Sequence, residues 1–250
     1  MQLFYYMDGN LSLTYNQGQR IVSLSGEEGA HLRVLRLKPG DKIHLTDGRG
    51  NLCKGNVLEA GSKTNAIELT DLQTSVKDTG KIHIAVAPPK NIARFEWFLE
   101  KATEIGINEI TPFFSEHSER IKLRTDRLNK ILISAMKQSL RTYLPVLNEP
   151  LSLESFLQKT PSSKNESEIT ENRFIAWLDK ESEQKHLVQV CPSNTPVVVL
   201  IGPEGDFSHN EVSLAKSVGY ITVSLGQSRL RTETAALAAC LTVKLINEIK

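Results

Sequence analysis

In the first part of the chain, apolar and polar residues alternate in short runs. Residues typical of turns separate these runs. Such alternation is typical of strands with one buried face. Strands are predicted at residues 20–24, 41–47, 51–59 and 65–71, with residues 47–51 as a hairpin loop. Between them, His31, Leu32 and Leu35 have helical spacing in a segment that ends at Pro39 and Gly40. Many short strands with one small helix predict a small β-barrel over residues 1–72.

In the second part, residues 73–250, strands alternate with amphipathic helices. Phe95, Phe98, Leu99 and Ala102, for example, share one face of a helix that stops at Gly106. Helices are predicted at 91–107, at 125–140, from about His209 and at 232–249, and strands within 81–90, 108–114, 173–179, 197–201 and 220–225. This α/β alternation predicts a parallel sheet covered on both faces. The polar, serine-rich residues 159–172 predict an exposed loop.

Composition and charge narrow the class of protein. The 250 residues are 40% hydrophobic and 24% charged, which is typical of globular proteins in water, and the net charge of +1 gives no indication of a nucleic-acid partner. No apolar run approaches the roughly 18 residues that span a bilayer, and the N-terminus lacks a signal-peptide pattern. The cysteines Cys53, Cys191 and Cys240 form neither a metal motif nor a disulfide framework, so a reducing cytoplasm and no metal are expected.

The segment LIGPEGDFSHNEV, residues 200–212, predicts a glycine-rich loop between a buried strand and a helix. Ser208 and Glu211 have the spacing of a capping box, which indicates a helix start. Glycines let the backbone approach a ligand closely, and the helix N-terminus offers free N–H groups. The loop alone fits equally well a tight turn that binds nothing.

Two further strand ends carry unusual loops. The strand at 173–179 ends in Asp179, and the strand at 220–225 is followed by Arg229, Arg231 and Glu233. Because ligands of parallel sheets bind at the carboxyl ends of the strands, neighbouring strands would bring these loops to one pocket. Neither a P-loop motif nor a GxGxxG motif is present, so a P-loop nucleotide site and a Rossmann dinucleotide site are not expected. The remaining candidates for the ligand are another nucleotide-like or adenosyl compound.

Several motifs of the chain together resemble those of one known family. IGPEGDFSHNE followed by SLGQSRLRTETAALAA resembles the paired motifs of the RsmE family, SPOUT-class methyltransferases that act on small-subunit ribosomal RNA. HLRVLRLKPGD, EKATEIGINEITPFFSEHSE and KQSLRTYLP are similar to that family in the same order, so nearly the whole chain is covered. Three departures stand out: Asp206 replaces a glycine of GPEGG, MQLFYY replaces an arginine-rich start, and SAMKQS lacks two glutamates.

The resemblance implies a fold, a cofactor and a reaction. Residues 1–72 would be a PUA-like β-barrel that binds RNA, and residues 73–250 a SPOUT-type parallel sheet with a C-terminal trefoil knot, a feature that periodicity never predicts. S-adenosylmethionine would bind in the knot of a homodimer. The enzyme would methylate N3 of one uridine near the 3′ end of 16S ribosomal RNA.

The resemblance also assigns residues to roles. The cofactor would contact Leu178, Ile201, Gly202, Pro203, Glu204, Gly205, Leu225, Gly226, Leu230 and Thr234. Arg231 would stabilise the uracil anion that forms when N3 loses its proton, with Glu233 as a second catalytic candidate. Arg231 could instead pair with Glu233 or Glu204, Glu233 could serve only to begin the last helix, and Glu204 could be purely structural.

Two basic sets are candidates for phosphate binding: Arg33, Arg36 and Lys38 in the first domain, and Arg120, Lys122, Arg124 and Arg127 in the second. Without the family, a charge run such as the second set is more often a solvated face than an RNA-binding site. Two rival functions also stay open, a ribose 2′-hydroxyl methyltransferase of transfer RNA and a noncatalytic RNA-binding assembly factor that keeps the pocket.

Overall fold

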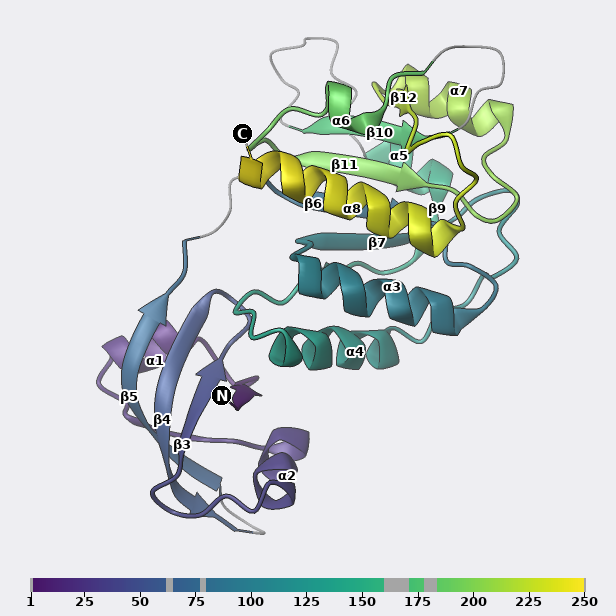
Figure 1. Ribbon diagram of the computed structural model, residues 1–250. Helices are drawn as coiled ribbons and strands as arrows, with labels where there is room; N and C mark the ends of the chain where they lie inside the picture. The colour runs from purple at the N-terminus through teal and green to yellow at the C-terminus, as the bar shows by residue number, and fades with distance from the viewer. Residues whose placement is uncertain (1, 62–64, 77–79, 160–170, 178–183, 250) are drawn as a thin grey trace. The chain divides into compact units, whose positions relative to one another are not determined.

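The computed structural model describes residues 2–61, 65–76, 80–159, 171–177 and 184–249 (Figure 1). The chain divides into two compact units. One comprises residues 1–77 and 133–144, and the other residues 78–132 and 145–250. None of the described helices is long and apolar enough to cross a membrane. Most of the predicted loop at 159–172 lies outside the described residues.

The sheet of the first unit has five strands: β1 (Leu3–Tyr5), β2 (Ile21–Ser23), β3 (Lys42–Thr46), β4 (Asn51–Ala60) and β5 (Asn65–Thr74). Their spatial order is β1-β3-β4-β5-β2, with β1 parallel to β3 and the other pairs antiparallel. Phe4, Val22, Leu45, Val57 and Ile67, one from each strand, are buried in a common core. Because all five strands share one core, the sheet must curl around it.

The four predicted strands are confirmed. The helix between them is also present, but it ends earlier in the chain than the sequence predicts. α2 (Gly26–Val34) stops before Pro39, since Arg36 has a left-handed φ of 55°. The pattern did not predict β1 or α1 (Leu11–Asn16). β1 has three residues, which is too short for alternation to be visible in a sequence.

One charged pair is buried in this unit. The Glu28 carboxylate on α2 forms a salt bridge with Lys137, which belongs to α4 (Thr125–Gln138), and the two side chains are only 9% and 20% exposed. Glu28 also accepts a hydrogen bond from the N–H of Tyr5 at 3.1 Å. The pair therefore ties α2, β1 and the end of α4 into one unit.

The second unit is built on a parallel sheet. Its strands are β6 (Ile82–Val86), β7 (Glu109–Phe114), β8 (Val146–Leu147), β9 (Leu151–Ser152), β10 (Asn172–Ala176), β11 (Val197–Ile201) and β12 (Ile221–Val223). The order is β12-β10-β11-β6-β7-β8, with β9 also pairing with β7, and every pair is parallel. The predicted mixed α/β fold with a parallel sheet is thus confirmed.

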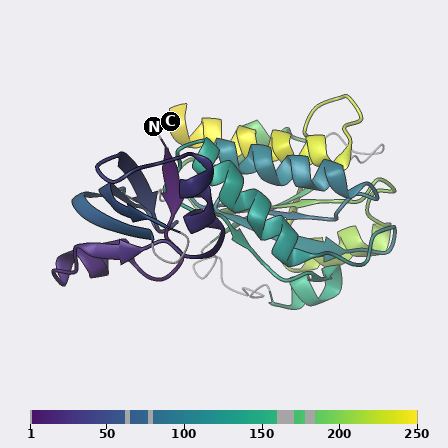
Figure 2. The ribbon, with the colours of Figure 1, turned by 90° about the horizontal axis from the view of Figure 1, so that it is seen from below.

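Helices cover both faces of this sheet. They are α3 (Ile92–Ile105), α5 (Leu153–Lys159), α6 (Leu187–Val190), α7 (His209–Ser217) and α8 (Thr232–Ile249). α8 packs against α3, β6 and β11, and Figure 2 shows the yellow α8 beside the blue α3. α5 and α7 pack together on the opposite face, where Leu153, Leu157 and Val212 join the buried core of the sheet.

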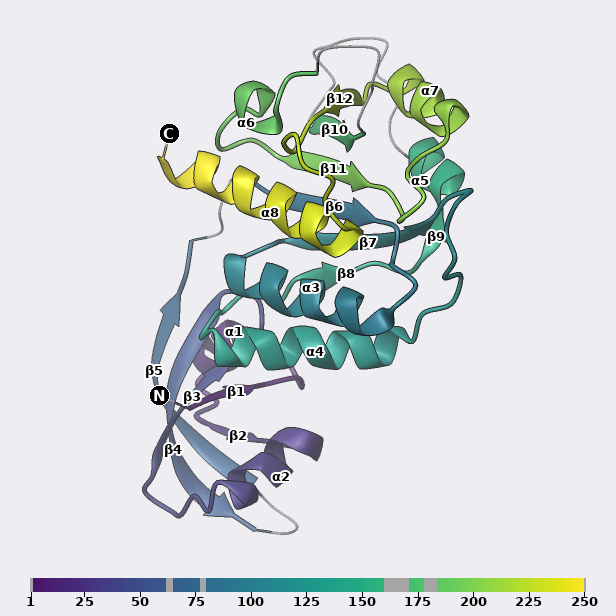
Figure 3. The same cartoon turned by 45° about the vertical axis from the view of Figure 1, so that its right-hand side comes forward.

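The strand order explains why the carboxyl ends of the strands are suited to bind a ligand. β10 lies between β12 and β11, and all three run in the same direction (Figure 3). Their carboxyl ends lie side by side, so the segments that follow Ala176, Ile201 and Val223 converge, as the loop pattern predicts. The sheet topology therefore places Trp177 and the loops after β11 and β12 around one space.

Candidate functional site

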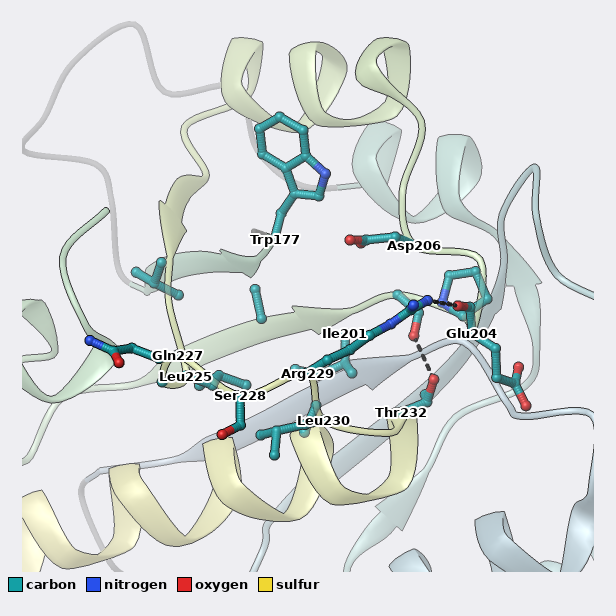
Figure 4. A pocket seen from close by; sticks show the side chains of 16 residues that line it. Trp177, Ile201, Glu204, Asp206, Leu225, Gln227, Ser228, Arg229, Leu230 and Thr232 are labelled. Carbon is teal, nitrogen blue, oxygen red and sulfur yellow. Dashed lines mark hydrogen bonds between the residues drawn. The ribbon is translucent and has the colours of Figure 1, made fainter. Parts of the chain in front are cut away.

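A pocket of about 510 Å³ opens at the carboxyl ends of β10, β11 and β12 (Figure 4). This volume is in the range of small-molecule sites in proteins. The pocket is lined by Ala176, Trp177, Ile201, Gly202, Pro203, Glu204, Asp206, Val223, Leu225, Gly226, Gln227, Ser228, Arg229, Leu230, Thr232 and Ala235. Apolar side chains and backbone form one part of this surface, and charged groups form another.

The glycine loop after β11 is shaped by contacts with the rest of the unit. A Cβ on Gly202 would lie 3.1 Å from the Phe207 ring, and one on Gly205 would lie 2.8 Å from the Cβ of His117. Asp206 has a φ of +65°, a backbone conformation that favours glycine. His117 donates from Nδ1 to the Asp206 carbonyl oxygen at 3.0 Å, and this bond raises the pKa of His117.

The start of α7 follows the predicted capping box. The Ser208 hydroxyl accepts from the N–H of Glu211 at 3.3 Å, and the Glu211 carboxylate accepts from the N–H of Ser208 at 2.9 Å. The same carboxylate accepts from the N–H of Glu116 at 2.8 Å. One glutamate therefore caps α7 and also binds the loop that follows β7.

A second loop braces the glycine loop from outside the pocket. The Glu204 carboxylate accepts from the backbone N–H of Lys90 at 3.0 Å. The Arg120 guanidinium donates to the carbonyl oxygens of Pro89 and Lys90, at 3.3 Å and 2.5 Å. Glu204 thus supports the loop through its carboxylate, while other parts of the residue line the pocket.

The loop between β12 and α8 closes the pocket on the other side. Gly226 has a φ of +124°, which only glycine adopts freely. The Thr232 hydroxyl donates to the Gly202 carbonyl oxygen at 3.1 Å, and Arg229 Nη2 lies 3.5 Å from the Glu204 carbonyl oxygen. The two loops are therefore joined directly, at the first residue of α8.

The predicted cofactor residues fall into three groups. Those that line the pocket are Ile201, Gly202, Pro203, Glu204, Leu225, Gly226 and Leu230. Gly205 and Thr234 do not line it: Gly205 faces His117, and Thr234 is exposed on the first turn of α8. Leu178, like Asp179, lies outside the described residues.

The two catalytic candidates differ in their surroundings. Arg231 is exposed, stands between the lining residues Leu230 and Thr232, and forms no salt bridge with Glu233 or Glu204. Glu233 is 7% exposed, its Oε1 lies 3.8 Å from Nε of Arg94, and its buried Oε2 has no hydrogen-bond partner among the described residues. Glu233 does not line the pocket, so it touches the site only through α8.

Several lining residues were absent from the predicted set. Trp177 directly follows β10, Asp206 ends the glycine loop, and Arg229 precedes Leu230. Each was visible in the sequence as a residue at or near a strand end, and Asp206 also as a departure from the family motif. Which of the loop residues turn inward depends on backbone geometry, and no spacing rule predicts it.

The basic residues predicted for RNA binding are not equivalent. Lys122 and Arg124 are exposed and form no salt bridge with any described residue, whereas Arg127 pairs with Glu96 at 2.7 Å. Arg120 is engaged with the 89–90 backbone. In the first unit, Arg36 and Lys38 are exposed, and Arg33 donates to the carbonyl oxygens of Gly29 and Gly61. The most available cations of the second set are therefore Lys122 and Arg124.

A second cavity of about 460 Å³ lies at the amino ends of β6 and β7. Its polar groups bind one another: Asn148 donates to Glu109 at 2.6 Å and to Thr111 at 2.7 Å, and Lys81 forms a salt bridge with Glu109. Burial lowers the pKa of His83 there to about 4, so the imidazole is neutral at pH 7. We assign no ligand to this cavity. Across the described chain, no group of three or more His, Cys, Asp or Glu side chains is placed to hold a metal ion.

Comparison with known proteins adds independent findings. A family model described as an RNA methyltransferase domain matches residues 76–244, and one described as an RNA methyltransferase PUA domain matches residues 24–69. The chain is 25% identical to the ribosomal RNA small subunit methyltransferase E of Rickettsia conorii, over 90% of both chains.

Two solved structures share the fold over essentially the full length. A probable rRNA-methyltransferase from Porphyromonas gingivalis is 37% identical, with a TM-score of 0.85 over 100% of this chain and 99% of that one. A ribosomal RNA small subunit methyltransferase E from Neisseria gonorrhoeae, whose structure contains S-adenosyl methionine, is 27% identical, with a TM-score of 0.82 over 99% and 98% of the two chains.

Proposed function

Because this chain belongs to the RNA methyltransferase family, we propose that it methylates N3 of one uridine near the 3′ end of 16S ribosomal RNA, with S-adenosylmethionine as the methyl donor. The observation that carries the proposal is the pocket at the carboxyl ends of β10, β11 and β12, which both family motifs line. A small ribosomal subunit as substrate places the enzyme in the cytoplasm.

The pocket fits the cofactor in size and chemistry. Ile201, Val223, Leu225 and Leu230 offer apolar contacts for an adenine ring, and the backbone of the glycine loop offers polar groups. Gly202 and Gly226 allow the backbone to approach a ligand where a side chain would intrude. When bound, S-adenosylmethionine supplies a methyl group on a positively charged sulfur, which is an electrophile.

The chain's own residues must then prepare the uracil. N3 carries a proton in neutral uridine, and it becomes nucleophilic as that proton passes to water and negative charge spreads to the ring oxygens. Attack of N3 on the methyl group then breaks the bond between carbon and sulfur and releases S-adenosylhomocysteine. Arg231 is exposed beside the pocket and has no carboxylate partner among the described residues, so its guanidinium is available to stabilise this charge. Glu233 is buried outside the pocket, so we assign it a positioning role at the start of α8.

The path of the chain supports a trefoil knot. β12 lies at the edge of the sheet beyond β10, yet α8 packs over β6 and β11 on the other side of β10. Residues 224–231 must therefore return across the sheet, and Thr232 meets Gly202 at the end of this return. We propose that this segment passes through the loop formed by residues around 202–208.

We also propose a homodimer. Leu241 and Leu245 on α8 are each 43% exposed and one helical turn apart, and Trp97 on the neighbouring α3 is 44% exposed. Such an apolar strip is typical of an interface. Sedimentation equilibrium is expected to give twice the 27.9 kDa chain mass, and Leu241→Glu with Leu245→Glu is expected to give the monomer. A monomeric wild-type protein at micromolar concentration would contradict the proposal.

RNA binding is expected to depend on Lys122 and Arg124 more than on Arg127. Each phosphate contact that is lost reduces the slope of log affinity against log salt by about one. Lys122→Ala and Arg124→Ala should therefore weaken RNA binding and flatten its salt dependence. Arg127→Ala is the matched control, because Glu96 already neutralises Arg127. Equal losses for all three variants would contradict the assignment.

A methyl-transfer assay with labelled S-adenosylmethionine tests the reaction itself. The acceptors are small subunits without the modification, naked 16S RNA and bulk transfer RNA, followed by mass analysis of the nucleosides. We expect 3-methyluridine from small-subunit RNA. Label on a ribose, or in transfer RNA, would keep the cofactor and overturn the substrate. Cofactor binding without any product would indicate a noncatalytic assembly factor.

A further inference from the structure

Two side chains of opposite charge, Asp206 and Arg229, line the pocket. Figure 4 shows the Asp206 side chain on one side of the pocket and the Arg229 side chain crossing the other, on a different loop. They form no salt bridge with each other or with any other described residue. Both lie at the end of the pocket near Glu204, away from Leu225 at the other end.

Asp206 occupies a position that would favour a smaller residue. Its φ of +65° suits glycine better than an acid. Its Oδ1 accepts from the N–H of Phe207 at 2.8 Å, which leaves the other carboxylate oxygen available. Partial burial raises the pKa of this carboxyl more than the Phe207 N–H, Arg229 and His117 lower it. An additional cation beside Asp206 would therefore be stabilised.

Most of the hydrogen-bond donors of Arg229 are likewise not used within the described part of the protein. Its single hydrogen bond to a described residue is long, 3.5 Å from Nη2 to the Glu204 carbonyl oxygen. A guanidinium has five N–H donors in a planar fork, so most of them remain available. This fork matches a carboxylate in two-point geometry.

S-adenosylmethionine ends in an amino acid whose ammonium and carboxylate are bonded to the same carbon. A negative and a positive side chain on two sides of one pocket match these two groups in charge. The apolar residues near Leu225 suit the adenine, which leaves the charged end of the pocket for the amino acid. Resting on the proposed function, we propose that Asp206 binds the ammonium and Arg229 the carboxylate of the cofactor.

Binding calorimetry with three ligands tests the assignment. S-adenosylhomocysteine has the whole amino-acid end, decarboxylated S-adenosylmethionine has only the ammonium, and 5′-methylthioadenosine has neither group. Asp206→Asn is expected to weaken the first two by about tenfold each and to leave the third unchanged. Arg229→Gln is expected to weaken only S-adenosylhomocysteine.

Asp206→Gly separates a lost contact from misfolding. Glycine relieves the backbone strain at φ +65°, so this variant should be at least as stable as the wild type, yet weaker in binding S-adenosylhomocysteine. An equal loss for all three ligands, or unchanged S-adenosylhomocysteine affinity with weaker RNA binding in Arg229→Gln, would overturn the inference alone. Wild-type protein that binds none of the three ligands would overturn the proposed function with it.

Discussion

Arg231→Ala is expected to slow methyl transfer by about 100- to 1,000-fold, the usual effect of removing one preorganised group that stabilises a developing anion. The side chain is exposed between Leu230 and Thr232, which line the pocket, and no described carboxylate neutralises it. Its charge is thus available to the uracil at the moment when N3 loses its proton. Arg231→Lys should retain part of the rate, because an ammonium keeps the charge but loses the planar fork.

Single-turnover methylation at saturating RNA measures this effect, together with the affinity for S-adenosylhomocysteine. Arg231→Ala should leave the affinity near the wild-type value, because Arg231 does not line the pocket. Arg229→Gln is the matched comparison two residues away, with the opposite expectation of weaker cofactor binding. A loss of cofactor affinity in Arg231→Ala that accounts for the slower reaction would contradict the catalytic role.

Lys137→Met is expected to destabilise the first unit by about 3 kcal/mol. Removing one partner of a buried ion pair leaves the other charge desolvated and uncompensated. Glu28 would lose its cationic partner and keep the hydrogen bond from the N–H of Tyr5, at 3.1 Å. Lys54→Met is the matched control in the same unit, because its salt bridge with Asp71 is about half exposed and should contribute under about 1 kcal/mol.

The measurement must report on the first unit. Both tryptophans, Trp97 and Trp177, belong to the second unit, so their fluorescence follows that unit. Hydrogen exchange of the amides of β3, β4 and β5 in increasing urea gives the stability of the first unit directly. Glu28→Gln combined with Lys137→Met should recover part of the loss, since it removes both charges. Equal stability of Lys137→Met and Lys54→Met would show that the pair is not effectively buried.

Some features of this structure depend only on residues that are close together in the sequence, and these could be predicted from the sequence alone. The strands and helices around the glycine loop follow from hydrophobic periodicity, and the start of α7 follows from the spacing of Ser208 and Glu211. These features depend on residues a few positions apart. The mixed α/β fold and the convergence of three strand ends follow in turn, because parallel strands must share one orientation.

Contacts between distant segments determine which side chains of these loops face the pocket. Arg229 turns inward and Arg231 does not, although both belong to one short loop. Gly205 meets His117 and Arg127 meets Glu96, contacts between residues that are 88 and 31 positions apart. Such partners are chosen by packing, where backbone direction and excluded volume from distant segments act together. The spacing of residues along the chain gives no information on backbone direction or on excluded volume. The sequence therefore predicted where the candidate site lies, but not which side chains contact one another there.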